Sequence, residues 1–135
     1  MDRKAYDDYL SKFQARDYEG VLDCYADDLE IVFAGYALRS KDEVRRFYGW
    51  FHEHVREEIE VRRFVADERT IALEADVRLT GLKPLTPEIL AAKGFERLMG
   101  PEPGQTIVIP QFIHYHLKDG KFARALCAVF EAPRA

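Results

Sequence analysis

The sequence predicts a single α+β domain, in which a cone-shaped, curved, mostly antiparallel sheet wraps around three N-terminal helices. Three observations lead to this fold class. Apolar residues recur with helical spacing in the first third of the chain. They alternate with polar residues in most of the remainder. The 135 residues are enough for one hydrophobic core but not for two. Helices followed by antiparallel strands is the order of an α+β fold.

Two short helices are predicted at the N-terminus. The first has one apolar stripe at positions i, i+3, i+4 and i+7, formed by Tyr6, Tyr9, Leu10 and Phe13. The second repeats this spacing, with Asp17 as its N-cap, and its stripe consists of Tyr18, Val21, Leu22 and Tyr25. The turn between them falls at residues 15–17, so the two helices form a hairpin.

A short strand at 29–35 should lead into a third helix. That helix opens with a capping box, Ser40 followed by Glu43 three residues later. Its apolar face consists of Val44, Phe47, Tyr48, Phe51 and Val55. His52 and His54 lie at opposite margins of this face, because residues two apart on a helix point in different directions.

The rest of the chain is predicted to be two β-hairpins separated by an insert. Segments 58–66 and 70–81 alternate and are joined by a turn at 67–69; segments 105–117 and 121–131 meet at Asp119-Gly120. The insert, residues 82–104, holds a lid-like helix at 85–99 with Thr86-Pro87 as its start, an N-cap followed by proline at the first helical position. We therefore expect one domain, 1–135, with an insert at 82–104.

Composition narrows the class of partner. The formal net charge is -4, and no basic stripe is interleaved with aromatics, so nucleic acid is not an expected partner. The apolar runs are too short to span a bilayer, so no membrane association is expected either. Lone Cys24 and Cys127 lack metal-binding spacing and suit a reduced, cytoplasmic protein. No secretory signal is visible at the N-terminus, which agrees with that location.

Four stretches resemble the SnoaL-like group of the nuclear transport factor 2-like (ketosteroid isomerase-like) superfamily. Residues 9–33 resemble its helix hairpin and first strand, and LRSKDEVRRFYGWF its third helix. IALEADVRLTG is similar to its central strand, and LKDGKFARALCAVFE to its final hairpin with a DGK turn. The resemblance implies an apolar pocket between helices and sheet, and a homodimer formed through the outer sheet face. It does not select one activity, because many activities share this fold.

The same resemblance allows the catalytic positions of known enzymes of the superfamily to be compared with the residues of this chain. Tyr9 lies where ketosteroid isomerase, an enzyme whose site carboxyl groups have tuned pKa values, has its tyrosine. Phe33 and Phe112 lie where it has carboxylates, so isomerisation of that kind lacks its base. Ala75, Val77 and Cys127 replace the charged residues of the limonene-type epoxide hydrolases. A one-residue shift of the central strand would instead turn Glu74 and Asp76 inward and Arg78 with them. The alternating pattern favours an outward position for these three residues.

His114 and His116 share one strand face with Phe112, and the resemblance makes this the pocket face. An imidazole there could act as an acid or base, or it could be a hydrogen-bonded pocket wall. The hydroxyl of Tyr9 could donate to a substrate oxygen, or Tyr9 could be core. His114 and Tyr9 are the catalytic candidates. A metal site needs a third ligand that the sequence does not supply, so neither metal nor organic cofactor is expected.

The expected pocket accepts a small hydrophobic molecule with one or two oxygens. Besides Tyr9 and His114, its lining is predicted to consist of Phe13, Phe33, Phe47, Trp50, Phe51, His54, Phe112, His116 and Cys127. Three functions remain open: an isomerase, dehydratase or cyclase; a ligand-binding protein without turnover; and a dimeric interaction module. The sequence leaves open whether the protein is an enzyme.

Overall fold

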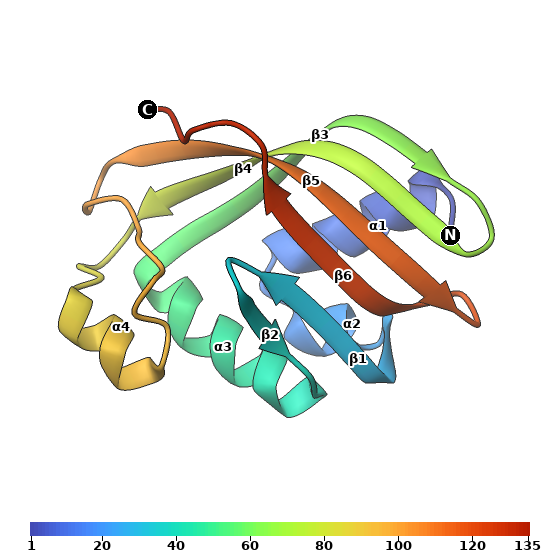
Figure 1. Ribbon diagram of the computed structural model, residues 1–135, viewed down its shortest axis with the longest axis horizontal. Coiled ribbons are helices and arrows are strands. Elements are labelled where there is room, and N and C mark those ends of the chain that lie inside the picture. The colour runs from blue at the N-terminus through green and yellow to red at the C-terminus, as the bar shows by residue number, and fades with distance from the viewer.

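The computed structural model describes residues 1–135 and shows four helices and one sheet of six strands (Figure 1). The elements in chain order are α1 (Arg3–Gln14), α2 (Tyr18–Leu22), β1 (Tyr25–Phe33), β2 (Tyr36–Leu38), α3 (Lys41–His54), β3 (Val55–Ala66), β4 (Thr70–Gly81), α4 (Pro87–Lys93), β5 (Thr106–Lys118) and β6 (Lys121–Val129). No helix is long and apolar enough to cross a membrane.

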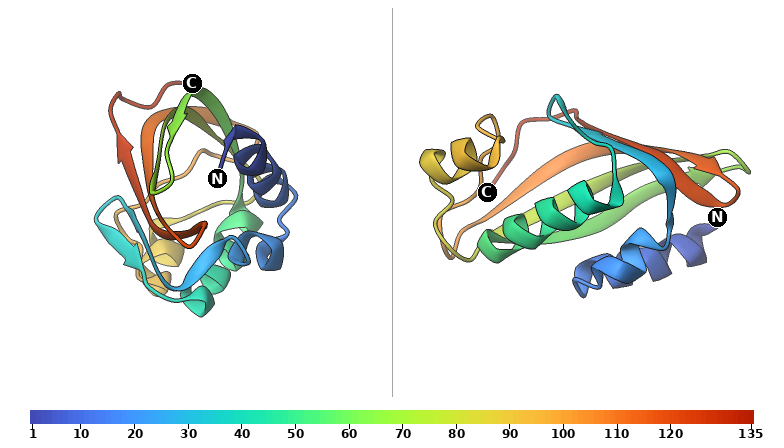
Figure 2. Two further views of the ribbon diagram at one scale, coloured as in Figure 1. Left: turned by 90° about the vertical axis from the view of Figure 1, so that its right-hand side faces the viewer. Right: turned by 90° about the horizontal axis from the view of Figure 1, so that it is seen from below.

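The strands follow the order β2-β1-β6-β5-β4-β3, and the sheet curls around α1, α2 and α3 (Figure 2). Helix α4 lies beyond the end of the sheet where β4 stops and β5 starts, next to α3 (Figure 1). The predicted fold class is confirmed. All pairings are antiparallel except the one between β1 and β6, which is parallel because β6 returns from the far side of the sheet to pair with the first strand.

The predicted helix starts are present. Asp17 accepts a hydrogen bond from Gly20 N, Ser40 from Glu43 N and Thr86 from Ile89 N. The Glu43 carboxylate accepts from Arg39 N, one residue before the N-cap. Helix starts are visible in sequence because each needs a local side-chain acceptor for backbone N–H groups that no helical carbonyl reaches.

Several predicted boundaries were wrong. The first strand runs from Tyr25 to Phe33 and not over 29–35, and Val55 begins β3 and is not part of α3. Tyr25 belongs to β1 and not to α2, which ends at Leu22. Here the i, i+3, i+4, i+7 pattern continues across a change of element, because Tyr25 faces the same core from a strand. The helix expected within 85–99 stops at Lys93, where Gly94 adopts a left-handed φ of 83° that ends it.

Both predicted hairpin turns form. Asp119 and Gly120 have φ values of 53° and 75°, which is the two-residue turn whose twist suits a hairpin. At the other turn the Asp67 side chain accepts from Arg69 N and Thr70 N. These turns fix which residues of β3 and β4, and of β5 and β6, face each other.

Gly81 marks the point where both ends of the insert meet the sheet. Its N–H donates to Gln105 O over 2.9 Å, and its carbonyl accepts from Gly104 N over 2.9 Å. A Cβ at this position would lie 2.7 Å from Pro101 O, and closer still to Glu102 O. A side chain therefore cannot enter without moving backbone.

We expect Gly81→Ala to lower the free energy of unfolding by about 1–3 kcal/mol, the usual range for overpacking. Gly49→Ala is the matched control, because Gly49 lies in α3 with no atom within 4 Å of an added Cβ. That change should stabilise the protein by about 0.5–1 kcal/mol, since alanine favours helix. Urea unfolding of both variants gives the comparison; equal effects would contradict the close approach at Gly81.

Candidate functional site

Tyr9, predicted to donate a hydrogen bond to a substrate oxygen, lies inside the hydrophobic core and is 4% exposed. Its hydroxyl lies 3.3 Å from that of Tyr25, and the hydroxyls of Tyr6 and Tyr115 form a second pair at 2.8 Å. Burial raises the pKa of all four phenols well above the ordinary value. The four phenols therefore stay protonated at physiological pH. In that state they can donate hydrogen bonds but cannot remove a proton from a substrate.

Cys127 faces the same interior from β6. Burial raises the pKa of its thiol to about 12, and the charge of Glu57 adds to this effect. A cysteine acts as a nucleophile through its thiolate, which this environment disfavours. Cys127 is thus a half-buried, unreactive thiol packed against the core, and its role in a pocket stays a prediction.

The orientation predicted for His114, His116 and Phe112 was wrong. All three are exposed on the convex, outer face of β5, and the rings of the two histidines lie 5.4 Å apart. Their neighbours Ile113 and Tyr115 point inward and are 4% and 3% exposed. Both faces of this strand carry large side chains, so alternation could not say which one enters the core.

The opposite faces of the sheet separate His114 from Tyr9, so these two side chains do not form one catalytic site. His114 instead borders a shallow hollow of about 450 Å³ on the outer face, together with Phe112 and Val65. Nowhere in the chain do three or more His, Cys, Asp or Glu side chains gather closely enough to hold a metal ion.

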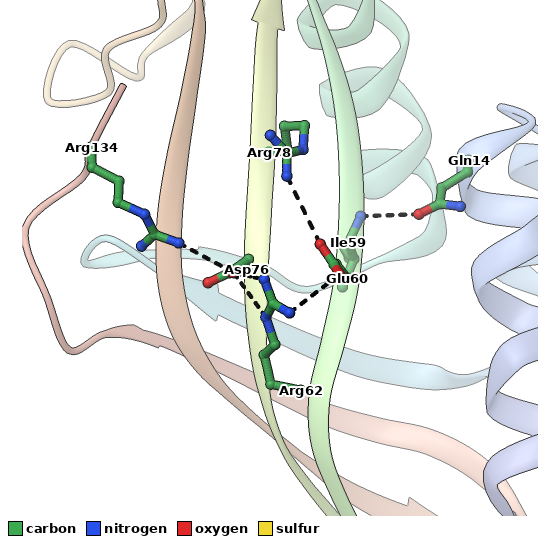
Figure 3. A network of polar contacts seen from close by, with 7 residues as sticks. All are labelled: Gln14, Ile59, Glu60, Arg62, Asp76, Arg78 and Arg134. Atoms are coloured by element: carbon green, nitrogen blue, oxygen red, sulfur yellow. Dashed lines mark hydrogen bonds and ion pairs between the residues drawn. The ribbon is translucent and has the colours of Figure 1, made fainter.

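Strand β4 takes the register that the alternating pattern favours. Ala75 and Val77 are buried on the inner face, and Asp76 pairs across the outer face with residues of its neighbours. Asp76 accepts from Arg62 Nε over 2.9 Å and Nη2 over 2.7 Å, and from Arg134 over 3.3 Å (Figure 3). The C-terminal segment reaches this site because Arg134 pairs with Val108 through two backbone hydrogen bonds.

Hydrogen bonds from Arg62 lower the pKa of Asp76, against the effect of burial, and the charges of Arg62 and Arg134 lower it further. A carboxyl group with a lowered pKa stabilises the fold above its unfolded-state pKa, about 3.9, and loses that contribution as pH falls through its folded-state pKa. We expect Asp76→Asn to lower the free energy of unfolding by about 1–3 kcal/mol at neutral pH.

The deficit of Asp76→Asn should shrink as the pH falls below about 3.9, the ordinary aspartate pKa, and through the lowered pKa of the folded wild-type carboxyl group. Urea unfolding at neutral and acidic pH checks this. Glu74→Gln on the same strand is the control, since its only ion pair spans 4.0 Å to an 82% exposed Arg63. A deficit for Asp76→Asn that is the same at both pH values would contradict the ion-pair explanation.

Sequence reasoning missed the polar chain Tyr18–His52–Glu57. His52 is 2% exposed; its Nδ1 lies 2.8 Å from the Tyr18 hydroxyl and its Nε2 lies 2.9 Å from Glu57 Oε1. The imidazole also stacks on Tyr48 at 4.9 Å. The available signal was the position of His52 beside Tyr48 at the margin of the apolar face of α3, but nothing local placed its partners. This chain joins α2, α3 and β3.

A cleft of about 550 Å³ lies between α3, β2 and α4. Its lining consists of Ala37, Leu38, Glu43, Arg46, Phe47, Trp50, Ala92, Lys93 and Phe95. Phe47 and Trp50 were predicted pocket residues, and Phe33 lies beside them, its ring 5.1 Å from that of Phe47. Of the other predicted pocket residues, Phe13 and Phe51 are buried in the core and do not line the cleft.

The insert forms one wall of this cleft through Phe95. The Phe95 ring lies 4.8 Å from the rings of Tyr36 and Phe47, 5.7 Å from Trp50 and 6.3 Å from Phe33. His54 anchors the start of the insert, because its Nδ1 lies 3.0 Å from Pro84 O. His54 was predicted to line the pocket, but it does not line the cleft and instead contacts the backbone of the insert. The sequence could not reveal this wall, since Phe95 is far from α3 along the chain.

Comparison with known proteins identifies the family. Residues 6–125 match the model of the SnoaL-like domain. The chain belongs to the SnoaL-like family. None of the curated proteins is similar enough to this SnoaL-like domain in sequence to count as a match.

Solved structures share the fold of this SnoaL-like domain at low sequence identity. An NTF2-like protein of unknown function from Burkholderia pseudomallei is 15% identical over 93% of this chain and 88% of its own, with a TM-score of 0.71. A candidate polyketide cyclase from Silicibacter sp. is 22% identical over 90% and 82%, with a TM-score of 0.71. TerC, co-crystallised with polyporic acid, is 17% identical over 93% and 88%, with a TM-score of 0.68.

Proposed function

We propose that this SnoaL-like domain binds a small, mostly apolar molecule in the cleft between α3, β2 and α4. The observation that carries the proposal is the cleft itself, about 550 Å³ and walled by the rings of Phe47, Trp50 and Phe95. Its volume lies within the roughly 300–1,000 Å³ typical of ligand pockets. Aromatic walls with a few charged groups at the rim suit a ring-containing ligand with polar substituents. The co-crystal of TerC with a small molecule agrees with this kind of function.

The test uses Trp50, the one tryptophan of the chain, as a fluorescent reporter inside the cleft. Small neutral and acidic aromatic compounds are titrated into the protein, and we expect saturable quenching. Ala92→Phe should abolish it by filling the cleft. Ala91→Phe is the matched control, because Ala91 is exposed on the same helix but does not line the cleft. Quenching that survives Ala92→Phe would place the ligand elsewhere.

Catalytic turnover is a second candidate function. It is favoured by the contact between His52 and Glu57, because a carboxylate that is hydrogen-bonded to an imidazole can act as a general base. Isomerases, dehydratases and cyclases of carbonyl compounds begin by removing a proton beside the carbonyl. The protein would then accelerate deuterium exchange at the methyl group of acetophenone in heavy water, followed by NMR, and Glu57→Gln would abolish the acceleration. Exchange at the buffer rate with wild-type protein would exclude this activity for simple ketones.

We also propose a homodimer formed through the outer sheet face. Phe112 and Phe130 are 47% and 41% exposed, and their rings stack at 4.3 Å. With Val129, 56% exposed and next to Phe130 in sequence, they supply exposed apolar surface, and contiguous patches of such surface are typical of protein–protein contacts. Light scattering should give a dimer for wild-type protein and a monomer for Phe112→Arg. Met99→Arg, at a 75% exposed site in the insert, should remain a dimer; a wild-type monomer would exclude this assembly.

A further inference from the structure

The cleft carries two cationic side chains that have no acidic partner. Arg46 of α3 and Lys93 of α4 both line it, together with Trp50. Neither forms an ion pair within 4.0 Å, whereas nine of the other arginine side chains do, among them Arg45 next in sequence. These two charges are therefore available to a ligand.

The single acid of the cleft is already engaged. Glu43 Oε2 accepts from the backbone N–H of Arg39 over 3.0 Å and so caps the start of α3. The lining thus has two cations and one anion, although the chain as a whole has a net charge of -4. A local excess of positive charge on an acidic protein attracts an anionic ligand and disfavours a cationic one.

The aromatic walls define the shape of the apolar part. The Trp50 ring lies 5.4 Å from Phe47, nearly perpendicular to it, and Lys93 Nζ lies 6.0 Å from the centre of the Trp50 ring. A planar ring placed against Trp50 would bring a substituent within reach of both cations. Arginine binds carboxylates through two parallel N–H groups, and lysine adds a point charge.

We infer that the ligand of this cleft is a planar aromatic molecule with an anionic oxygen, a carboxylate or an acidic enol, held by Arg46 and Lys93. This inference rests on the proposed function and adds the ligand's charge to it. A neutral ring compound would use the aromatic walls alone and bind more weakly. Because both cations are exposed, salt should weaken the binding of the acid but not that of its neutral analogue.

The experiment compares cinnamate with cinnamamide, which has the same shape but no charge, by quenching of Trp50 fluorescence. We expect cinnamate to bind about three- to tenfold more tightly at low salt, the effect of about 1 kcal/mol for an exposed ion pair. Arg46→Gln combined with Lys93→Gln should reduce the affinity for cinnamate to that for cinnamamide, and leave cinnamamide unchanged. Lys4→Gln, on α1 and in no ion pair, is the charge-matched control for one lysine.

Each outcome decides between the two proposals. Tighter binding of cinnamate that the double variant removes supports the anionic ligand. Equal affinities of the two compounds, both lost in Ala92→Phe, overturn the charge inference and leave the binding cleft intact. No saturable quenching by either compound overturns both proposals. A preference for cinnamate that persists in the double variant shows that other groups hold the charge, and so overturns the assignment to Arg46 and Lys93.

Discussion

Tyr6→Ala should destabilise this protein more than any other change considered, by about 3–5 kcal/mol, the range for removing a large aromatic from a core. Tyr6 is 0% exposed, and its ring contacts those of Tyr9, Phe64, Tyr115 and Phe122. It joins α1 to three different strands of the sheet. The loss of one ring therefore leaves a cavity where helix and sheet meet, and a domain of this size has only about 5–15 kcal/mol of stability.

Tyr6→Phe separates the ring from its hydroxyl. This variant keeps the packing and removes only the partner of the Tyr115 hydroxyl, 2.8 Å away, so its cost should be about 1–3 kcal/mol. Urea unfolding followed by circular dichroism gives both values. If Tyr6→Phe costs as much as Tyr6→Ala, the hydroxyl pair and not the ring packing is the main contribution. If Tyr6→Ala costs less than about 1 kcal/mol, the core is assigned wrongly.

His52→Leu is expected to have the second-largest effect, a loss of about 3 kcal/mol, the upper end for an unsatisfied polar group and the lower end for a broken buried pair. Leucine fills a similar volume but leaves the Tyr18 hydroxyl and the Glu57 carboxylate without their hydrogen bonds. The Glu57 side chain is 17% exposed, so water replaces the lost partner only in part. The cost arises from a charged acceptor left unpaired, which exceeds the cost of a neutral one.

His114→Leu is the matched control for His52→Leu, because it makes the same substitution at an exposed site of the outer face. Its effect should stay within about 0.5 kcal/mol, as for most surface positions. Thermal unfolding of both variants side by side checks the pair. A large loss for His114→Leu with little loss for His52→Leu would show that the two histidines have the opposite environments.

His52 and His114 show the limit of what the sequence could predict. The spacing of His114 and His116 was easy to see and attracted a functional interpretation, yet both residues point to solvent. His52 looked like the edge of a helix face, yet it is one of two buried polar or charged residues, with Asp76. A histidine's role depends on what lies opposite its ring, and Tyr18 and Glu57 come from α2 and β3.

The residues of the candidate cleft also fall into two groups, those predicted from the sequence and those that only the structure revealed. Phe47 and Trp50 were predicted pocket residues from the family resemblance, and the capping box and helical period place both of them on α3. Arg46, Lys93 and Phe95 were not predicted, and they give the cleft its charge and its second wall. An exposed arginine or lysine looks the same in sequence whether or not an acid faces it.

The sequence by itself determined the local structure of this protein: the helix starts at Asp17, Ser40 and Thr86, the turn at Asp119-Gly120, and the α+β order that led to the SnoaL-like family. Each helix start and the turn depend on residues within four positions of one another, and the α+β order follows from the succession of such local patterns along the chain. Only the tertiary structure decided which face of β5 is buried and which cations lack partners. Those properties arise between segments far apart in the chain, and the alternation of a strand with two apolar faces is the same in either orientation.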